Sequence, residues 1–529
     1  MTVARDVRER PGAARSEADG YDTWAGGTPL DGLARRAMRL PWCWPALLTL
    51  LFGCYQLDRP ELWPDELWSW SFAADPVHEL VASASRSNSA ELGYDLVLHY
   101  WMAAFGDSVV AMRMLSVLAM AGAAACVTLA GRRLAGVRAG LLAGLVFALL
   151  PSVSRFAQEV RFYAPVVLVV TVATLLLLCA LDAPSVRRWA AYGACLAVVG
   201  YIDIVALLVI AGHAAGVALR WWQDRDVRLL GFAPAAAAGL AACLPLAAVS
   251  WGKAGTQVWW INRPGLDLYA FSSLVRNLFY STSVAAAVIV LGVLAWASWR
   301  AAAFATAMAV LPVGALWLLS QGPHSYFIGR YLLFTIGAWA ILAGIGLSRL
   351  DLRLSAAAVL VIAIFGAGDQ QVIRESGAHS WSAYPAGYGG HYLDYAGAAS
   401  TIAGEARAGD GIVYREGNLW WDMIGPGLQY YLHRDMPHGV QVPRELFVAT
   451  TVPQSSQINP VACHHPAACL GDEPRIWIVG SGYQKDPYRA IAASRAAVLR
   501  PRYRLSLTRH FRGLTVFLLV RDVRPGPAG

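Results

Sequence analysis

A series of long apolar runs constrains the fold of this chain more than any other feature. The runs cover residues 42–57, 109–130, 139–154, 164–181, 189–202, 204–219, 229–250, 282–299, 302–320, 331–348 and 354–368. A helix that crosses a bilayer needs roughly 20 apolar residues, because the hydrocarbon core is about 30 Å thick. Only 15% of the 529 residues are charged, against about 25% in a soluble domain. We therefore expect an α-helical polytopic membrane protein with about eleven transmembrane helices.

Arginines at the ends of these runs indicate how the chain is oriented. The short connections that contain them fall on one side: Arg132 to Arg138, Arg187-Arg188, Arg220 to Arg228, Trp299-Arg300 and Arg349 to Arg353. Positive charge marks the cytoplasmic side, so the basic tail 1–40 is expected to be cytoplasmic and disordered. An odd number of spans then places the C-terminal part outside a plasma membrane. Because the arginines are spread over the ends of the runs, the net charge of +8 indicates membrane lipids rather than nucleic acid as partners.

A change of composition divides the chain after the apolar runs. We expect a transmembrane module at 41–368, with a first extracytoplasmic loop at 58–108, and an extracytoplasmic α/β domain at 369–529. The predicted elements of this domain are helices at 396–408 and 487–499 and strands at 412–414, 476–479 and 514–520. Strands that alternate with helices are typical of an α/β domain. In the first loop, residues 92–105 are expected to form an amphipathic helix.

Two adjacent acids follow the first apolar run, in the stretch Trp63-Pro64-Asp65-Glu66. This pattern is also typical of an ordinary helix start, which does not compete with a functional role. A carboxylate there can deprotonate an acceptor hydroxyl, so Asp65 and Glu66 are the catalytic candidates. Adjacent side chains on a helix face different ways. We therefore expect one of the two to act as the base and the other to orient substrate, bind a metal or hold a basic residue.

The second outward loop contains Glu159, Arg161 and Tyr163. Taken singly these residues have ordinary explanations, since Arg155 and Glu159 are spaced to pair along a helix and Arg161 can reach the head groups. Together, the planar donors of Arg161 and the hydroxyl of Tyr163 suit a phosphate, which the start of the following helix also favours. These three residues are candidates for binding the phosphate or another part of a substrate.

Positive charge recurs on the outer side at Lys253, Arg263 and Arg330, and Tyr331 follows the last of these. Basic residues outside run against the positive-inside trend, and an anionic lipid phosphate would account for them. Lys253, Arg330 and Tyr331 therefore join the substrate-binding candidates.

Other features of the sequence carry weaker signals. Asp203, between two apolar runs, is more simply a polar turn than a site residue. Cys463 and Cys469 favour a short-loop disulfide over a zinc site in an oxidising compartment. The sequence contains no Gly-Lys-Ser/Thr phosphate loop, no Gly-x-Ser-x-Gly and no His-Glu-x-x-His, so an ATP-driven pump, a serine hydrolase and a zinc protease are not indicated.

The order of these motifs resembles the GT-C class of polytopic glycosyltransferases. It is most similar to the bacterial family 39-like branch of dolichyl-phosphate-mannose–protein mannosyltransferases and lipid A aminoarabinose transferases. The resemblance covers roughly residues 42–350 and rests on Trp63-Pro64-Asp65-Glu66, Gly93-Tyr94, Arg113-Met114-Leu115-Ser116, Gln158-Glu159-Val160-Arg161-Phe162-Tyr163 and Arg330-Tyr331-Leu332-Leu333. The chain departs from the protein mannosyltransferases after the second loop, and its C-terminal part does not resemble their β-trefoil insert.

The resemblance implies that a monosaccharide, mannose or a similar pentose or hexose, is transferred from a polyprenyl phosphate outside the membrane. The acceptor would be a glycan, a lipid or a protein. By position Asp65 would be the base, and Arg161, Arg330 and Lys253 would bind the phosphate. Direct displacement of this kind inverts the anomeric centre. No metal ligand is predicted, although a divalent metal ion is a further candidate for stabilising the leaving phosphate.

Two other functions are compatible with a polytopic chain of this composition. A transporter or flippase of lipid-linked sugars would need polar residues at mid-membrane, whereas here they gather near the outer boundary. A non-catalytic membrane scaffold that binds glycan would keep its function when Asp65 is replaced by asparagine.

Overall fold

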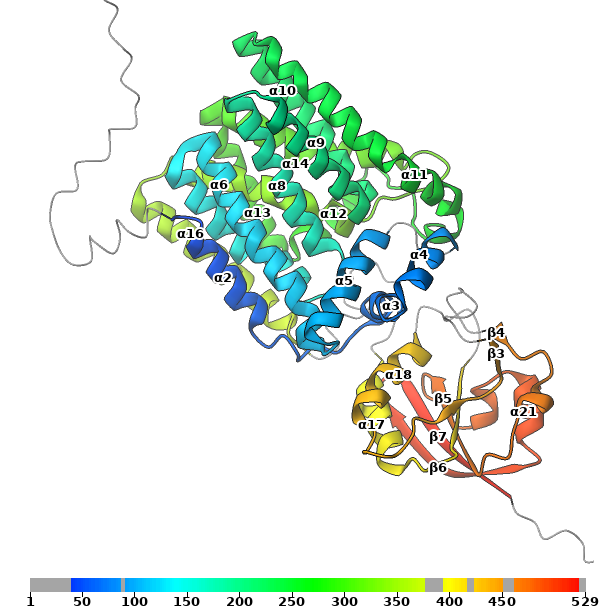
Figure 1. Ribbon diagram of the computed structural model, residues 1–529. Coiled ribbons are helices and arrows are strands. Elements are labelled where there is room, and N and C mark those ends of the chain that lie inside the picture. The colour runs from blue at the N-terminus through cyan, green and yellow to red at the C-terminus, as the bar shows by residue number, and fades with distance from the viewer. Residues whose placement is uncertain (1–39, 87–90, 376–392, 416–422, 451–460, 523–529) are drawn as a thin grey trace, which may run out of the picture. The chain divides into compact units, whose positions relative to one another are not determined.

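The computed structural model describes residues 40–86, 91–375, 393–415, 423–450 and 461–522 (Figure 1). Almost all of the predicted basic tail lies outside these residues. The first part of the chain is helical. Its helices are α2 (Cys43–Cys54), α3 (Pro64–Ala73), α4 (Val77–Arg86), α5 (Leu92–Phe105), α6 (Val109–Leu149), α7 (Pro151–Ala157), α8 (Tyr163–Asp182), α9 (Val186–Ile202), α10 (Val209–Asp224), α11 (Phe232–Gln257), α12 (Leu268–Phe279), α13 (Thr282–Leu294), α14 (Trp299–Leu319), α15 (Ile336–Leu347) and α16 (Leu352–Val372). Short 3₁₀ helices η2 (Ile204–Leu208), η3 (Val227–Gly231), η4 (Ala295–Ser298) and η5 (Gly329–Thr335) join some of them.

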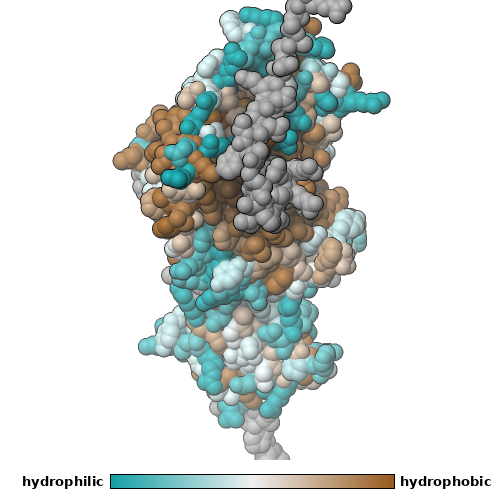
Figure 2. Space-filling view, turned by 90° about the vertical axis from the view of Figure 1, so that its left-hand side faces the viewer, coloured by the Kyte–Doolittle hydropathy of each residue, from teal (hydrophilic) through white to brown (hydrophobic). Residues whose placement is uncertain are grey.

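The protein is embedded in a membrane through this helical part. Among the described residues, seven helical segments are long and apolar enough to cross a bilayer. Two of them, Val109–Leu149 and Thr282–Leu319, each contain two of the runs that the sequence separates, so the expected count of eleven is not confirmed. Figure 2 shows apolar side chains gathered in a broad band over the helical part. Exposed apolar residues such as Leu51 of α2 and Ile364 of α16 contribute to the lipid-facing surface.

α6 is two helices joined by a tight break. Ala135 and Gly136 leave the helical conformation, and Gly136 has a φ of 90°, which glycine adopts without steric cost. The two halves then pack closely, because a Cβ added at Gly140 would lie 2.4 Å from the carbonyl oxygen of Thr128. Glycine at these positions therefore allows the arginine-rich connection between the predicted runs 109–130 and 139–154 to form a hairpin.

The C-terminal part is an α/β domain built on a mixed sheet. Its helices are α17 (Tyr395–Glu405), α18 (Ile424–Asp435), α20 (Pro466–Cys469), η8 (Pro487–Arg489) and α21 (Ala493–Leu499), and its strands are β1 (Gly411–Tyr414), β2 (Arg444–Glu445), β3 (Val448–Thr450), β4 (Val461–Ala462), β5 (Arg475–Ser481), β6 (Tyr503–Phe511) and β7 (Leu514–Arg521). The sheet order is β2-β1-β5-β7-β6. β1 pairs in parallel with β2 and β5, and β7 pairs antiparallel with β5 and β6.

Two layers of helices cover this sheet. Alternate residues of β1 face opposite sides, so Ile412 joins the core that includes α17 and α18, while Val413 joins the core that includes α21. The three predicted strands and the helix at 396–408 are confirmed. The predicted helix 487–499 is wrong as one element. It divides into η8 and α21, because Ala492 has the extended ψ of 142°.

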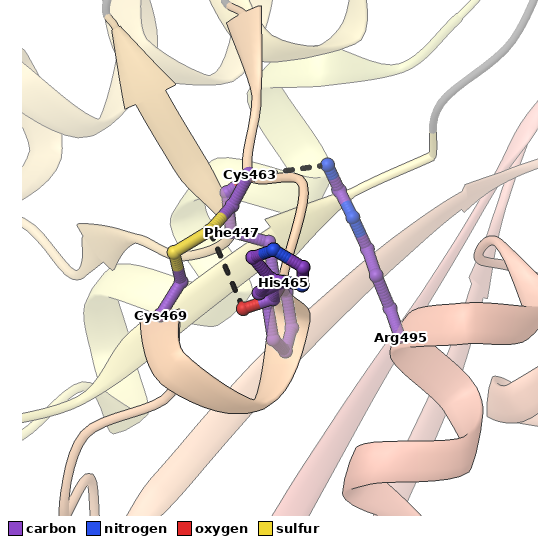
Figure 3. The surroundings of a disulfide bond; sticks show 5 residues. All are labelled: Phe447, Cys463, His465, Cys469 and Arg495. Carbon is purple, nitrogen blue, oxygen red and sulfur yellow. Dashed lines mark hydrogen bonds between the residues drawn. A yellow bond between two sulfur atoms is a disulfide. The ribbon is translucent and has the colours of Figure 1, made fainter.

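The Cys463–Cys469 disulfide joins the residue after β4 to the last residue of α20, which confirms the expectation for these cysteines (Figure 3). Next to it, Arg495 of α21 is buried and donates to the Phe447 carbonyl oxygen at 3.3 Å. Its guanidinium lies 5.4 Å from the centroid of the Phe447 ring. Burial lowers the pKa of Arg495 to about 10. The Phe447 carbonyl oxygen thus accepts two hydrogen bonds, one from Arg495 and one from the backbone N–H of Cys463 at 2.9 Å.

α18 also contacts the first loop of the membrane part. The Tyr431 hydroxyl accepts from the backbone N–H of Leu62 at 3.3 Å, and the Tyr430 hydroxyl donates to the Asp107 carbonyl oxygen at 3.0 Å. The Tyr430 ring packs edge-on against Trp70 of α3, with 5.1 Å between centroids. These contacts fix the residue Leu62 before α3 and the Trp70 side of α3, the helix that carries Asp65.

Candidate active site

Asp65 and Glu66 lie at the start of α3, and their side chains have different surroundings. Pro64 is the first residue of the helix, and the Glu66 carboxylate accepts from the backbone N–H of Trp63 at 3.4 Å. Glu66 is fully buried, whereas Asp65 keeps 16% of its side chain exposed. Of the two predicted catalytic acids, Asp65 is therefore the one whose side chain is partly exposed.

Arg113 of α6 holds the Glu66 carboxylate. Its Nε and Nη2 donate to the two carboxylate oxygens at 2.9 and 2.8 Å. Nη1 donates to the carbonyl oxygens of Leu57 and Pro60 at 2.8 and 2.7 Å. Glu66 also accepts from the backbone N–H of Val160 at 2.9 Å. Glu66 thus holds a basic residue, one of the roles expected for this pair of acids, and connects the first loop with the second.

Glu159 is buried and bound to other parts of the protein. Its carboxylate pairs with Arg155 at 3.1 Å, as their spacing predicts, and accepts from the Trp63 indole at 2.9 Å. Its carbonyl oxygen accepts from the Ser116 hydroxyl at 2.6 Å. Burial raises the pKa of Glu159, and the charge of Arg155 opposes this shift. This predicted substrate-binding residue therefore connects the second loop with the residue that precedes α3.

Arg161 is buried, and its guanidinium contacts the first loop. Its terminal nitrogens donate to the two carboxylate oxygens of Glu91 at 2.7 and 2.5 Å. Nη1 also donates to the Ser69 hydroxyl at 2.9 Å and to the Asp65 carbonyl oxygen at 3.4 Å. Burial disfavours the charge of Arg161, but Glu91 and Asp65 raise its pKa. Sequence reasoning missed Glu91, since no local pattern marks a glutamate whose partner is 70 residues away.

Arg330 reaches the same acid from η5. Its Nη1 lies 3.3 Å from the Asp65 carboxylate. The Arg330 guanidinium also lies 5.9 Å from the centroid of the Tyr331 ring, the neighbouring candidate residue. Gly329 allows η5 to approach α12 here, because a Cβ at this position would lie 2.3 Å from the Cβ of Asn277. Asp65, Arg161 and Arg330, predicted from three separate loops, are therefore brought together.

Lys253 takes a more peripheral position than the arginines. It lies on α11 and is partly exposed. The end of α11 approaches the loop that precedes η5, because a Cβ added at Gly255 would lie 3.4 Å from the His324 ring. Lys253 is therefore two residues from Gly255, which lies against His324 in the loop that precedes η5.

Asp203 connects α9 with η2, and the polar turn expected there is confirmed. Its side chain accepts from the backbone N–H of Val205 at 2.9 Å. Burial raises the pKa of Asp203 to about 7, an effect that the hydrogen bond opposes and the charge of Glu91 increases. α5 packs tightly on this turn, because a Cβ at Gly93 would lie 2.2 Å from the carbonyl oxygen of Tyr201.

Three buried donors near this cluster have no hydrogen-bond partner in the described part of the chain. They are the Arg161 Nε–H and the hydroxyls of Tyr163 and Tyr94. Arg161 lies 5.9 Å from the Tyr163 ring centroid, and Tyr94 packs edge-on against Phe162, with 6.5 Å between centroids. Buried polar groups in proteins almost always find partners. This group of donors is therefore suited to a ligand with several acceptor oxygens. Tyr94 was missed as a site residue, although it lies in one of the stretches that carry the family resemblance.

Tyr94 also lines an apolar cavity of about 320 Å³. Side chains of α5, α6 and α8 surround it, including Trp101, Leu118 and Leu168. Tyr94 thus lines the apolar cavity and also interacts with the charged cluster around Arg161. No group of three or more His, Cys, Asp or Glu side chains among the described residues is arranged to hold a metal ion.

Two solved structures have the same arrangement of elements. ArnT from Cupriavidus metallidurans in the apo state matches with a TM-score of 0.59 and 15% identity, over 93% of this chain and 98% of that one. The same protein bound to undecaprenyl phosphate matches with a TM-score of 0.57 and 15% identity, over 90% and 97%. No protein-family model matches the sequence, and no curated protein does. The chain therefore has an ArnT-like fold over most of its length, as its motifs predicted.

Proposed function

We propose that this protein is a membrane glycosyltransferase that uses a polyprenyl-phosphate monosaccharide and transfers the sugar to an acceptor on the extracytoplasmic face. The observation that carries the proposal is the meeting of Asp65, Arg161 and Arg330 at one place, with unpartnered buried donors beside them. An acid and two arginines are the groups needed to activate a hydroxyl and to stabilise a leaving phosphate. The ArnT-like fold supports this reading, since one of the similar structures has undecaprenyl phosphate bound.

In this proposal the donor phosphate lies among Arg161, Arg330 and the hydroxyl of Tyr163. The guanidinium group suits two phosphate oxygens at once, and a phosphate can accept from the Arg161 Nε–H and the Tyr163 hydroxyl that lack partners here. The polyprenyl chain would enter the 320 Å³ apolar cavity beside Tyr94. An apolar cavity next to a cluster of positive charge matches the two chemical halves of such a donor.

Asp65 acts as the base in this mechanism. It accepts the proton of the acceptor hydroxyl while the hydroxyl oxygen bonds to the anomeric carbon. The bond from that carbon to the phosphate oxygen breaks, and the polyprenyl phosphate leaves with the electron pair. Displacement from the opposite face inverts the anomeric centre. Glu66 serves as a positioning residue, because Arg113 and Val160 already occupy its carboxylate.

The orientation and domain limits remain part of the proposal. The basic tail 1–40 is cytoplasmic, the module 41–368 crosses the membrane, and the domain 369–529 lies outside. The contacts of Tyr430 and Tyr431 with the first loop support a domain on the same side as Asp65. Mannose, or a related pentose or hexose, is the proposed sugar, and a glycan, a lipid or a protein is the acceptor.

Sugar transfer from radiolabelled polyprenyl-phosphate monosaccharides tests this function in membranes that contain the full chain. We expect the wild type to transfer label and Asp65→Asn to lose about 10²–10⁴-fold in rate, since a positioned base contributes about that much. Asp75→Asn is the matched control, because Asp75 is a partly exposed acid in the same loop, beyond the end of α3. It should keep wild-type transfer.

Other outcomes of the same assay separate the alternatives. Unchanged transfer by Asp65→Asn would remove Asp65 from the mechanism and direct the search to Glu66 and Glu159. A product that keeps the anomeric configuration of the donor would exclude single displacement. Absence of transfer with every donor would favour a transporter or flippase of lipid-linked sugars.

A further inference from the structure

We propose that Glu91 is an exchangeable counter-ion of Arg161, which the donor phosphate displaces when it binds. The inference rests on the proposed function and adds to it a residue that sets the affinity for the donor. Glu91 occupies both terminal nitrogens of Arg161, at 2.7 and 2.5 Å. This two-point geometry is the one in which a guanidinium also binds phosphate. A phosphate that takes the same two-point position must therefore replace the carboxylate.

Arg161 is the fixed member of this pair. Its Nη1 has two further acceptors, the Ser69 hydroxyl at 2.9 Å and the Asp65 carbonyl oxygen at 3.4 Å. Its guanidinium lies 5.2 Å from the ring centroid of Phe162 and 5.9 Å from that of Tyr163. These contacts hold Arg161 beside Asp65 whether or not Glu91 is present.

Glu91 is the member of the pair that can leave. It precedes α5 as the N-cap residue, but its side chain makes no capping hydrogen bond to that helix. Its side chain is 16% exposed, against 7% for Arg161. The helix itself is anchored through the close approach of Gly93 to the Tyr201 carbonyl oxygen. Rotation of the Glu91 side chain therefore frees Arg161 without moving α5.

Besides Arg161, the groups that interact with Glu91 include acids and hydroxyls. Asp95 on α5 and Asp203 at the start of η2 both interact electrostatically with it. The hydroxyls of Tyr94 and Tyr331 also interact electrostatically with Glu91. The hydrogen bonds from Arg161 therefore hold the Glu91 carboxylate in a place where its other neighbours are acids and hydroxyls. A phosphate that takes over Arg161 releases Glu91 toward solvent.

The exchange has a measurable consequence for affinity. If the donor phosphate binds only to molecules in which Glu91 has left Arg161, the apparent dissociation constant is the intrinsic constant divided by the fraction of such molecules. Replacing Glu91 with glutamine removes the competing charge and keeps the size of the side chain. We therefore expect the dissociation constant for a prenyl phosphate to fall about tenfold in Glu91→Gln, for a competent fraction of about one tenth.

The test uses the full chain in detergent and farnesyl phosphate as the probe, with binding measured by calorimetry. Glu79→Gln is the matched control, a glutamate of α4 in the same loop, and its affinity should equal that of the wild type. The tighter binding of Glu91→Gln should disappear when Arg161→Gln is added, because the two residues act through one contact. If Glu91 had only a structural role, Glu91→Gln would lower both the affinity for the probe and the thermal stability of the protein.

Each result has a distinct meaning. Equal or weaker binding by Glu91→Gln, with the wild type binding normally, would overturn the exchange and leave the proposed function intact. Binding that tightens in Glu91→Gln and in the Glu91→Gln, Arg161→Gln double variant alike would also overturn it. Failure of both wild type and Glu91→Gln to bind the probe would overturn the polyprenyl-phosphate donor and, with it, this inference.

Discussion

Asp65 and Glu66 are adjacent acids whose roles are separated by their surroundings. Glu66 is enclosed and faces Arg113, a charge that is itself fully buried. Removing one partner of a buried pair leaves the other charge without compensation, which is far more costly than losing an exposed pair. The Arg113–Glu66 pair therefore holds the start of α3 in place, whereas the Asp65 carboxylate is partly exposed and pairs with Arg330.

This leads to a prediction about Arg113. Arg113→Gln should destabilise the protein by about 3–5 kcal/mol, since Glu66 would remain buried without a counter-charge. The expected result is a clear fall in the melting temperature of the full chain in detergent. Arg133→Gln is the control, because its pair with Asp182 is 41% and 54% exposed and should contribute no more than about 1 kcal/mol. Similar melting temperatures for the two variants would contradict the structural role of Arg113.

At the scale of elements, small residues decide how closely the membrane helices pack. The hairpin in α6 brings Gly140 against the backbone of Thr128 and Arg132, within 2.4 and 2.6 Å of where a Cβ would lie. Membrane helices commonly use such residues for close contact, because lipid provides no hydrophobic drive for their association. Arg113 lies on the first half of α6, which this hairpin joins to the second half.

Two glycine substitutions test the hairpin with the same chemical change. Gly140→Ala should destabilise the protein by about 1–3 kcal/mol, since the added methyl group meets backbone atoms that cannot move aside. Gly314→Ala, in α14, has no atom within 4 Å of the new methyl group and should be neutral or stabilising by up to about 1 kcal/mol. Melting temperatures that shift in opposite directions would support the packing. A shift of the same sign and size would contradict it.

At the scale of the whole molecule, the chain combines a helical membrane part that contains a cluster of charged side chains with an α/β domain that contacts the first loop. The contact uses Tyr430 and Tyr431 of α18. The helix lies between β1 and β2, so the sheet holds it in a defined place. Glu445 on β2 is within 3.5 Å of Gln429 on the same helix. Burial raises the pKa of Glu445 to about 7.

The raised pKa of Glu445 predicts how the stability of the full chain depends on pH. Between its ordinary pKa and about 7, the folded protein keeps a proton that the unfolded chain releases. The free energy of unfolding should therefore decrease as pH rises through this range, by up to about 1.4 kcal/mol per unit. Glu445→Gln should flatten the fall of melting temperature between pH 5 and 7, whereas Glu405→Gln, exposed on α17, should leave it unchanged. A wild-type melting temperature that rises over this range would contradict the prediction.

The sequence by itself determined the membrane class, the helix at 92–105, three strands of the C-terminal sheet and the loops that carry Asp65, Arg161 and Arg330. These features follow from hydropathy, periodicity and charge over short windows, which are local properties of the chain. The number of crossings stays a prediction, because two of the seven long apolar segments among the described residues, Val109–Leu149 and Thr282–Leu319, each contain a break between two helices.

Only the tertiary structure decided which charges face one another. Arg113 pairs with an acid 47 residues away and Arg161 with one 70 residues away, and Arg330 reaches Asp65 from the last part of the membrane module. Tyr94 became a candidate site residue only because the structure places it beside the apolar cavity and gives its buried hydroxyl no partner among the described residues. Such contacts depend on how distant helices pack, and no periodicity in a short stretch of sequence encodes the partner of a buried charge.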